Sequence, residues 1–154
     1  MISFIFSQKT INTLLTYSIS RMAIGLFFLI TGLNKLFHPT FKASMLHTIT
    51  GISFPYPQFT ANFTAASELI FGLLLALGLY TRFSAMVLNI ILFVALFTFD
   101  IPNHIPKGLE LWTWYSYLLY LPQVLYILFM LNAIEIGGGH LSLDSAIYKR
   151  RSTR

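Results

Sequence analysis

The sequence predicts an all-α, integral membrane four-helix bundle, formed by residues 1–154 as a single membrane domain with both termini cytoplasmic. Hydrophobic residues make up 56% of the chain and charged residues only 10%, whereas a soluble domain usually carries about 25% charged residues. The apolar residues are gathered in four segments, each close to the roughly 20 residues that a helix needs to cross a bilayer. We therefore expect lipid, rather than water, to surround most of the chain.

Short connections or helix-stopping residues separate the predicted spans. The spans cover residues 14–37, 61–80, 83–101 and 111–134, and a cytoplasmic tail follows at residues 137–154. Only two residues separate the second span from the third, so these two spans must be antiparallel neighbours. Three consecutive glycines from Gly137 end the fourth span, because glycine is a preferred helix stop. Pro122 interrupts that span.

Basic residues set the expected orientation, because cytoplasmic loops carry an excess of Lys and Arg. With four spans both termini share one side, and seven of the ten basic residues fall there: Lys9, Arg21, Arg82, Lys149, Arg150, Arg151 and Arg154. That side is predicted to be cytoplasmic. The other side carries the long connection at residues 38–60, with the rigid aromatic sequence Phe54-Pro55-Tyr56-Pro57. We interpret it as a connector; a lid lying in the membrane interface is the alternative.

The net charge of +5 is concentrated partly in the tail, and this position indicates which partner the charge favours. Four of the ten basic residues lie in this short segment beside the last span, so membrane lipid with anionic headgroups is the expected partner, and nucleic acid is not. Residues 142–151 are predicted to form a helix along the cytoplasmic surface, with Ser142 capping it through its hydroxyl. A tail without fixed structure is the alternative.

Glu68 is the most informative residue, because it lies inside an otherwise apolar span. A carboxylate at the centre of a membrane helix costs about 2.5–3.5 kcal/mol on insertion scales. Lys35 lies near the matching end of the first span, and small residues such as Gly32 and Gly72 share the stripes of these charges. Small residues let helices approach closely in lipid. We therefore predict that the first two spans pack together and that Lys35 and Glu68 pair in the outer half of the bundle.

Two interpretations of this pair stay open. A structural ion pair would set helix register, and it would persist because breaking a buried pair costs more than forming it gains. A functional pair would bind a ligand or exchange protons, since burial favours the neutral carboxyl whereas a nearby ammonium favours the carboxylate. On the functional interpretation, Glu68 and Lys35 are the candidate catalytic residues.

Further candidates could contact a ligand. Trp112 and Tyr115 belong to an aromatic cluster in the fourth span, which is either an aromatic belt or a stacking wall for a quinone ring. Arg21 and Arg82 either reach out to headgroups or, with Glu135, close the inner end of the bundle. The chain has no cysteine, and its histidines lie in or near loops. We therefore predict no metal site and no intrinsic redox cofactor.

The order of these residues resembles that of a known family. The first span carries Arg21, Gly25, Phe28, Gly32 and Lys35; the second carries Glu68, Gly72, Leu75 and Gly78, followed by Thr81-Arg82; the fourth is followed by a Gly-Gly-Gly-His-Leu-Ser-Leu-Asp segment at residues 137–144. This succession resembles the DoxX family of small four-helix bacterial membrane proteins. The resemblance implies a multi-pass protein of the bacterial cytoplasmic (inner) membrane. It also implies an association with redox systems, since the family includes the small subunit of a thiosulfate:quinone oxidoreductase.

By this resemblance, the leading hypothesis is that the chain is a small subunit or accessory of a quinone-linked oxidoreductase. It would take part in an enzymatic reaction only together with a redox partner protein that supplies the electrons. Quinone would bind in a cavity between the first, second and fourth spans, with Glu68 at its base, Lys35 at its rim, and Trp112 or Tyr115 on its wall. A non-enzymatic scaffold or assembly partner is one alternative, and a small transporter of protons or a weak organic solute is another. In a homo-oligomer, the polar stripe would face another copy.

Overall fold

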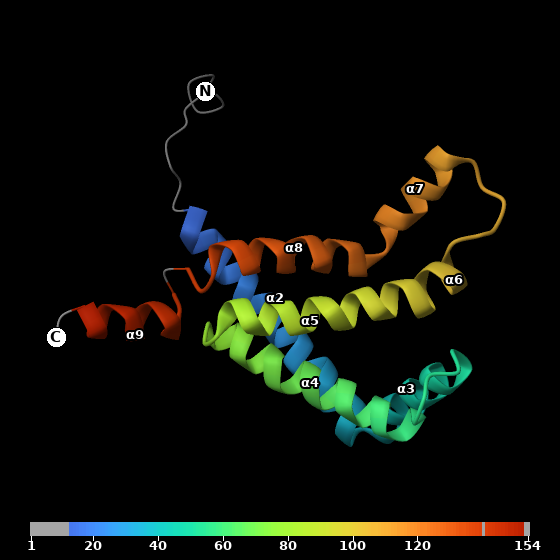
Figure 1. Cartoon of the computed structure of the whole chain (residues 1–154), viewed down its shortest axis with the longest axis horizontal. Coiled ribbons are helices and arrows are strands. Elements are labelled where there is room, and N and C mark those ends of the chain that lie inside the picture. The colour runs from blue at the N-terminus through green and yellow to red at the C-terminus, as the bar shows by residue number, and fades with distance from the viewer. Residues whose placement is uncertain (1–12, 140, 153–154) are drawn as a thin grey trace.

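The computed structural model describes residues 13–139 and 141–152, and their side chains at residues 15–139 and 141–147. Lys9, His140 and Arg154, as well as the side chains of Lys149 to Arg151, lie outside this description. The described residues are all-α (Figure 1). The elements are α2 Thr13–Phe37, α3 Pro39–Gly51, α4 Pro57–Leu77, α5 Thr81–Ala95, the π-helical segment η1 Leu96–Asp100, α6 Ile101–His104, α7 Leu111–Tyr120, α8 Pro122–Ile136 and α9 Leu143–Ser152.

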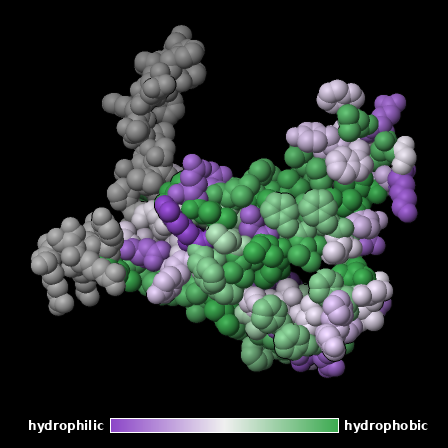
Figure 2. Space-filling model, viewed as in Figure 1, coloured by the Kyte–Doolittle hydropathy of each residue, from purple (hydrophilic) through white to green (hydrophobic). Residues whose placement is uncertain are grey.

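Among the described residues, three segments are long and apolar enough to cross a membrane, at Leu15–Phe37, Pro57–Leu77 and Thr81–His104. The pair α7 and α8 would make a fourth span, but the two helices are bent by 71° at their junction. Apolar residues cover most of the visible surface of these helices, as expected for a chain in contact with lipid (Figure 2). The prediction of an all-α, multi-pass membrane protein is confirmed.

The break in the fourth span follows from a single proline. Leu121 has extended backbone angles (φ −72°, ψ 120°), because the ring of Pro122 disfavours a helical conformation in the residue before it. Pro122 itself begins α8, where its missing amide hydrogen costs nothing. As a result α8 lies along α5, whereas α7 turns away from both (Figure 1).

Helices α2 and α4 make the most extensive contact in the molecule, as predicted from their small residues. A Cβ added to Gly32 would lie 2.5 Å from the backbone nitrogen of Leu69, and one added to Gly72 would lie 2.6 Å from that of Leu29. Gly25 is equally crowded. Glycine is therefore what allows the two backbones to approach so closely.

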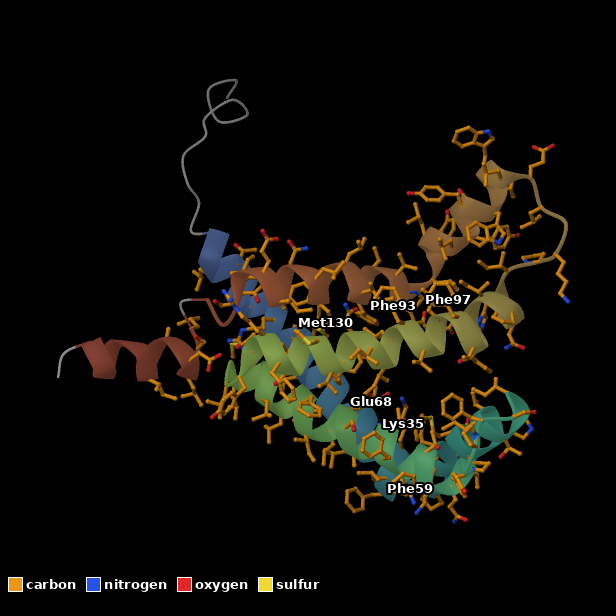
Figure 3. All side chains as sticks on the ribbon, viewed as in Figure 1. Lys35, Phe59, Glu68, Phe93, Phe97 and Met130 are labelled. Atoms are coloured by element: carbon orange, nitrogen blue, oxygen red, sulfur yellow. The ribbon has the colours of Figure 1, made fainter. Side chains whose placement is uncertain are left out.

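Helices α5 and α8 form the second closely packed pair, and they supply much of the apolar core. Met130 points from α8 toward α5 (Figure 3), where it is fully buried together with Leu88, Ala85 and Ala133. The turn between α4 and α5 is short: Gly78 adopts a left-handed conformation (φ 68°) and caps α4. The two helices are in contact, as predicted.

The long connection at residues 38–60 contains a helix, so the expectation of a simple connector is incomplete. Pro39 opens α3, since proline suits a first helical turn, and α3 packs against both α2 and α4. The chain then reverses through Ser53 and Tyr56, which both have positive φ angles, and enters α4. This connection therefore forms part of the packed structure at that end of the bundle.

The third span continues further than predicted, through η1 and α6 to His104. Pro102 explains the wider π-helical turn just before it. Proline lacks the amide hydrogen that would bond to the carbonyl of Thr98, and its ring crowds that carbonyl. Asp100 is the last residue of this wider turn, and it is buried.

Candidate functional site

Lys35 and Glu68 form the ion pair that the sequence predicts. The Lys35 Nζ atom donates hydrogen bonds to both Glu68 carboxylate oxygens, each at 2.7 Å. Figure 3 shows the two side chains next to each other. The Glu68 side chain is only 6% exposed, whereas that of Lys35 is 28% exposed. Glu68 is therefore the buried partner of the pair, and Lys35 is the accessible one.

The packing of α2 against α4 holds this pair in place. Lys35 follows Gly32 by three residues, and Glu68 lies between Ala65 and Gly72 at helical spacing. Residues three or four positions apart share one helix face. The glycines that bring the two backbones together therefore also bring the two charges face to face.

A cavity of about 400 Å³ lies against the pair, between α3, α4 and α5. Most of its lining is apolar, with aromatic rings from Phe54, Phe63 and Phe99. Phe63, Ile90 and Val94 line the cavity and are also exposed on the outer surface of their helices, so the cavity opens toward the lipid-facing surface. Figure 2 shows the molecule hollowed between α3–α4 and α5. Its size falls in the range of small-molecule sites, about 300–1,000 Å³.

This cavity does not coincide with the site expected between the first, second and fourth spans, which stays a prediction. Its walls come chiefly from α3, α4 and α5, and α8 contributes only Gln123. Trp112 and Tyr115 are not among its lining residues; they lie on α7, where Trp112 is 81% exposed. The physical reason is the bend at Leu121, which carries α7 away from the other helices.

Arg21 lies at the opposite end of the α2–α4 pair. Its side chain is fully buried, and its guanidinium donates hydrogen bonds to the backbone carbonyls of Leu75, Ala76 (2.9 Å) and Leu141 (2.6 Å). The first two carbonyls belong to the last turn of α4, which carries the negative end of the helix dipole. The structure therefore does not bring Arg21 to the cavity beside Glu68.

Arg82 lies at this same end. It donates a 3.2 Å hydrogen bond to the backbone carbonyl of Glu135, so the predicted association with Glu135 runs through the main chain. Arg82 also lines a hollow of about 460 Å³ together with Thr81, Gly137 and Asp144. Thr81 and Asp144 already bond to each other there. We call this region, formed by Tyr17, Ser18, Arg21, Leu75–Arg82 and Glu135–Asp144 without residue 140, the closed end.

Asp144 is a structural residue at the closed end that sequence reasoning missed. Its carboxylate accepts hydrogen bonds from the backbone amides of Tyr80 (2.9 Å) and Thr81 (3.0 Å) and from the Thr81 hydroxyl (2.9 Å). It thus caps the first turn of α5 from a distant part of the chain. The signal in the sequence was present, since Thr81 and Asp144 both belong to the motifs that resemble DoxX.

The predicted helix after the triple glycine is confirmed as α9. The Ser145 amide donates a 3.1 Å hydrogen bond to the Ser142 hydroxyl, so Ser142 caps the helix as expected. The segment before α9 is also tied to α2, because the Tyr17 hydroxyl donates to the Gly137 carbonyl at 2.7 Å. The location of α9 on a membrane surface stays a prediction.

Two polar residues of the cavity, Asp100 and Gln123, were not among the predicted site residues. Asp100 is buried at the end of η1, and Gln123 lies in the first turn of α8. The available signal was Asp100 itself, an acidic residue at the end of an apolar span. Across the described residues, no group of three or more His, Asp or Glu is arranged to hold a metal ion.

Comparison with known proteins adds one positive result. The DoxX family model matches residues 16–101, more than half of the chain. The matched region contains Arg21, Lys35, Glu68 and Arg82, and it ends before α7 and the glycine-rich segment. No curated protein and no solved structure matches the chain significantly.

Proposed function

The chain belongs to the DoxX family, and from that premise we propose that this multi-pass membrane protein binds quinone as an accessory subunit of a membrane redox system. The observation that carries the proposal is the Lys35–Glu68 pair on the wall of a largely apolar cavity. A redox partner protein supplies the electrons, and the site described above supplies the binding surface and the protons.

The chemistry of the cavity suits a quinone. The ring of a quinone is flat and apolar, so it can pack against the aromatic side chains of Phe54, Phe63 and Phe99. Its two carbonyl oxygens accept hydrogen bonds, and the Lys35 ammonium can donate one while Glu68 holds it in place. The opening toward the lipid-facing surface lets the long isoprenoid tail of a quinone remain in the bilayer.

The pair also offers a way to handle protons. Reduction of a quinone to a hydroquinone takes up two electrons and two protons, and an ionisable group near the ring can deliver a proton at that moment. The Lys35 side chain is partly exposed, whereas that of Glu68 is buried. The proposed route therefore runs from solvent through Lys35 to the ring, with the carboxylate stabilising the ammonium.

A binding measurement tests this proposal. Purified protein in phosphatidylcholine nanodiscs is titrated with a short-chain ubiquinone and a short-chain menaquinone, for the parent and for Glu68→Gln. We expect the variant to bind at least tenfold more weakly, because the neutral amide no longer positions the Lys35 ammonium, and a hydrogen bond to a charged group contributes about 1.5–3 kcal/mol. Glu135→Gln is the matched control, since this exposed residue lies at the closed end.

The outcomes separate the alternatives. Equal quinone binding by the parent and Glu68→Gln, with both proteins folded, would make the ion pair structural. A parent protein that binds no quinone would favour the scaffold or the transporter. A photoreactive quinone should label peptides from α3 and α5 rather than α7, whose Trp112 does not line the cavity.

A further inference from the structure

The cavity holds two buried oxygen atoms that have no hydrogen-bond partner. Within the described part of the chain, four buried side-chain atoms lack a partner: Arg21 Nε, Asn89 Oδ1, Asp100 Oδ2 and Gln123 Oε1. The last two belong to residues that line the cavity. A carboxylate oxygen and an amide oxygen both accept hydrogen bonds, so the lining of the cavity includes acceptors as well as the Lys35 donor.

Asp100 carries the stronger part of this observation. Its side chain is only 5% exposed, and it lies in the wide π-helical turn that precedes Pro102. His104 approaches its other oxygen, Oδ1, at 3.7 Å, but the His104 ring nitrogen bonds instead to the Asp100 backbone carbonyl at 3.1 Å. Oδ2 is therefore left without a donor among the described residues, in a side chain that belongs to the lining of the cavity. π-Helical turns of this kind often occur at functional sites.

The energetic cost argues against a purely structural role. A buried acceptor without a donor costs about 1–3 kcal/mol, and more when it is charged. Glu68, in the same cavity, avoids this cost because Lys35 donates to both of its oxygens. The Glu68 carboxylate thus has donors for both oxygens, whereas the Asp100 carboxylate lacks one for Oδ2. This difference is explained if a bound molecule supplies the missing donor to Asp100.

We propose that Asp100, with Gln123, forms a second polar site of the cavity that accepts hydrogen bonds from hydroxyl groups of the ligand, so that the cavity prefers hydroquinone to quinone. This inference rests on the proposed quinone site and names the redox form that the site retains. A quinone has only carbonyl acceptors, which would face the oxygens of Asp100 unfavourably. A hydroquinone has two hydroxyl donors, and one of them can reach Asp100 Oδ2 while Lys35 donates to the other oxygen.

Parallel titrations with both redox forms test the preference. Protein in phosphatidylcholine nanodiscs is titrated anaerobically with a short-chain ubiquinone and with its dithionite-reduced hydroquinone. We expect the parent to bind the hydroquinone about tenfold more tightly. Asp100→Asn should remove most of this preference, because the amide can donate a hydrogen bond to a quinone carbonyl and is a weaker acceptor for a hydroquinone hydroxyl. Gln123→Met should reduce the preference more weakly, and Glu110→Gln, at an exposed residue, should leave it intact.

A stability measurement separates a ligand role from a structural one. Without ligand, Asp100→Asn should unfold at the same temperature as the parent or at a higher one, because the carboxylate has an oxygen without a partner. A structural aspartate would instead lower the midpoint when replaced. A large loss of stability in Asp100→Asn would therefore overturn the inference.

The remaining outcomes are equally informative. If the parent binds both redox forms equally, or Asp100→Asn keeps the preference, the second polar site is wrong while the quinone site stands. If the parent binds neither form, both proposals fall. Lipid headgroups can also present hydroxyl groups; if phosphatidylglycerol in the nanodiscs abolishes the preference, the site takes lipid hydroxyls and the inference is overturned.

Discussion

The two ends of the α2–α4 pair each hold a cation from α2, but they hold it in opposite ways. At the closed end, the Arg21 guanidinium is buried and bonded to carbonyls from two separate parts of the chain. At the other end, which we call the open end, the Lys35 ammonium is partly exposed. It bonds to one side chain, Glu68, beside a cavity.

The difference shows which charge is available for chemistry. The carbonyls that bind Arg21 belong to the backbone, two of them to the last turn of α4, and the Arg21 side chain is fully buried, so it is not accessible to a ligand. Glu68 is a side chain with rotatable bonds, and the Lys35 side chain is partly exposed and lines the cavity. We therefore expect substitutions at the closed end to change stability and substitutions at the open end to change binding.

The largest effect is expected at Arg21. Arg21→Met would leave the carbonyls of Ala76 and Leu141 without the donor that Arg21 supplies, whereas that of Leu75 keeps the Gly78 amide. Each buried unpaired group costs about 1–3 kcal/mol. We expect a loss of about 3 kcal/mol or more in the free energy of unfolding, measured in mixed micelles by circular dichroism. Arg82→Met is the control, because Arg82 is exposed and makes one 3.2 Å bond to Glu135. Equal losses in the two variants would contradict the comparison.

The next largest effect concerns the spacing of the two helices at the open end. In Gly32→Ala the new Cβ would lie 2.5 Å from the backbone nitrogen of Leu69, so the helices must separate. Overpacking of this kind costs about 1–3 kcal/mol, and we also expect weaker quinone binding, because Lys35 lies one turn away. Gly51→Ala is the control, since no atom lies within 4 Å of its added Cβ. Unfolding midpoints that agree between the two variants would show that the contact can relax.

A smaller effect is expected when α5 loses its cap. Asp144→Ala removes the acceptor of the Tyr80 and Thr81 amides, and loss of a helix cap costs about 0.5–2 kcal/mol. Asp144→Asn keeps one acceptor oxygen and should lose less. Hydrogen exchange at the first amides of α5 is the most direct readout. Unchanged protection in Asp144→Ala would mean that other groups cap this helix.

The smallest change in stability is expected for the ion pair itself, when both partners are replaced together. Lys35→Met with Glu68→Leu swaps the pair for apolar side chains of similar size, which is often neutral or stabilising. We expect the free energy of unfolding to change by less than about 1 kcal/mol, while quinone binding is lost. A large loss of stability in the double variant would show that the Lys35–Glu68 ion pair stabilises the open end, as the Arg21 hydrogen bonds stabilise the closed end.

The sequence alone was sufficient for the parts of this protein that follow from local pattern. Apolar segments of suitable length predicted the membrane helices, and glycines at helical spacing predicted the contact between α2 and α4. The Lys35–Glu68 pair followed from these two, because antiparallel helices in close contact bring residues at matching depth together. Ser142 as a helix cap followed from its place after the glycines.

Only the tertiary structure decided which helices enclose the cavity and which contacts form at the two ends of the α2–α4 pair. Pro122 was visible in the sequence, but the direction of α7 after it, and hence the exposure of Trp112, depends on the packing of the whole bundle. Asp100 lies at the end of a π-helical turn and lines the cavity together with residues from other helices. Arg21 and Asp144 find partners far away in the chain. These contacts join segments that no shared helical pattern relates, so they depend on how the helices and the segments between them pack in three dimensions.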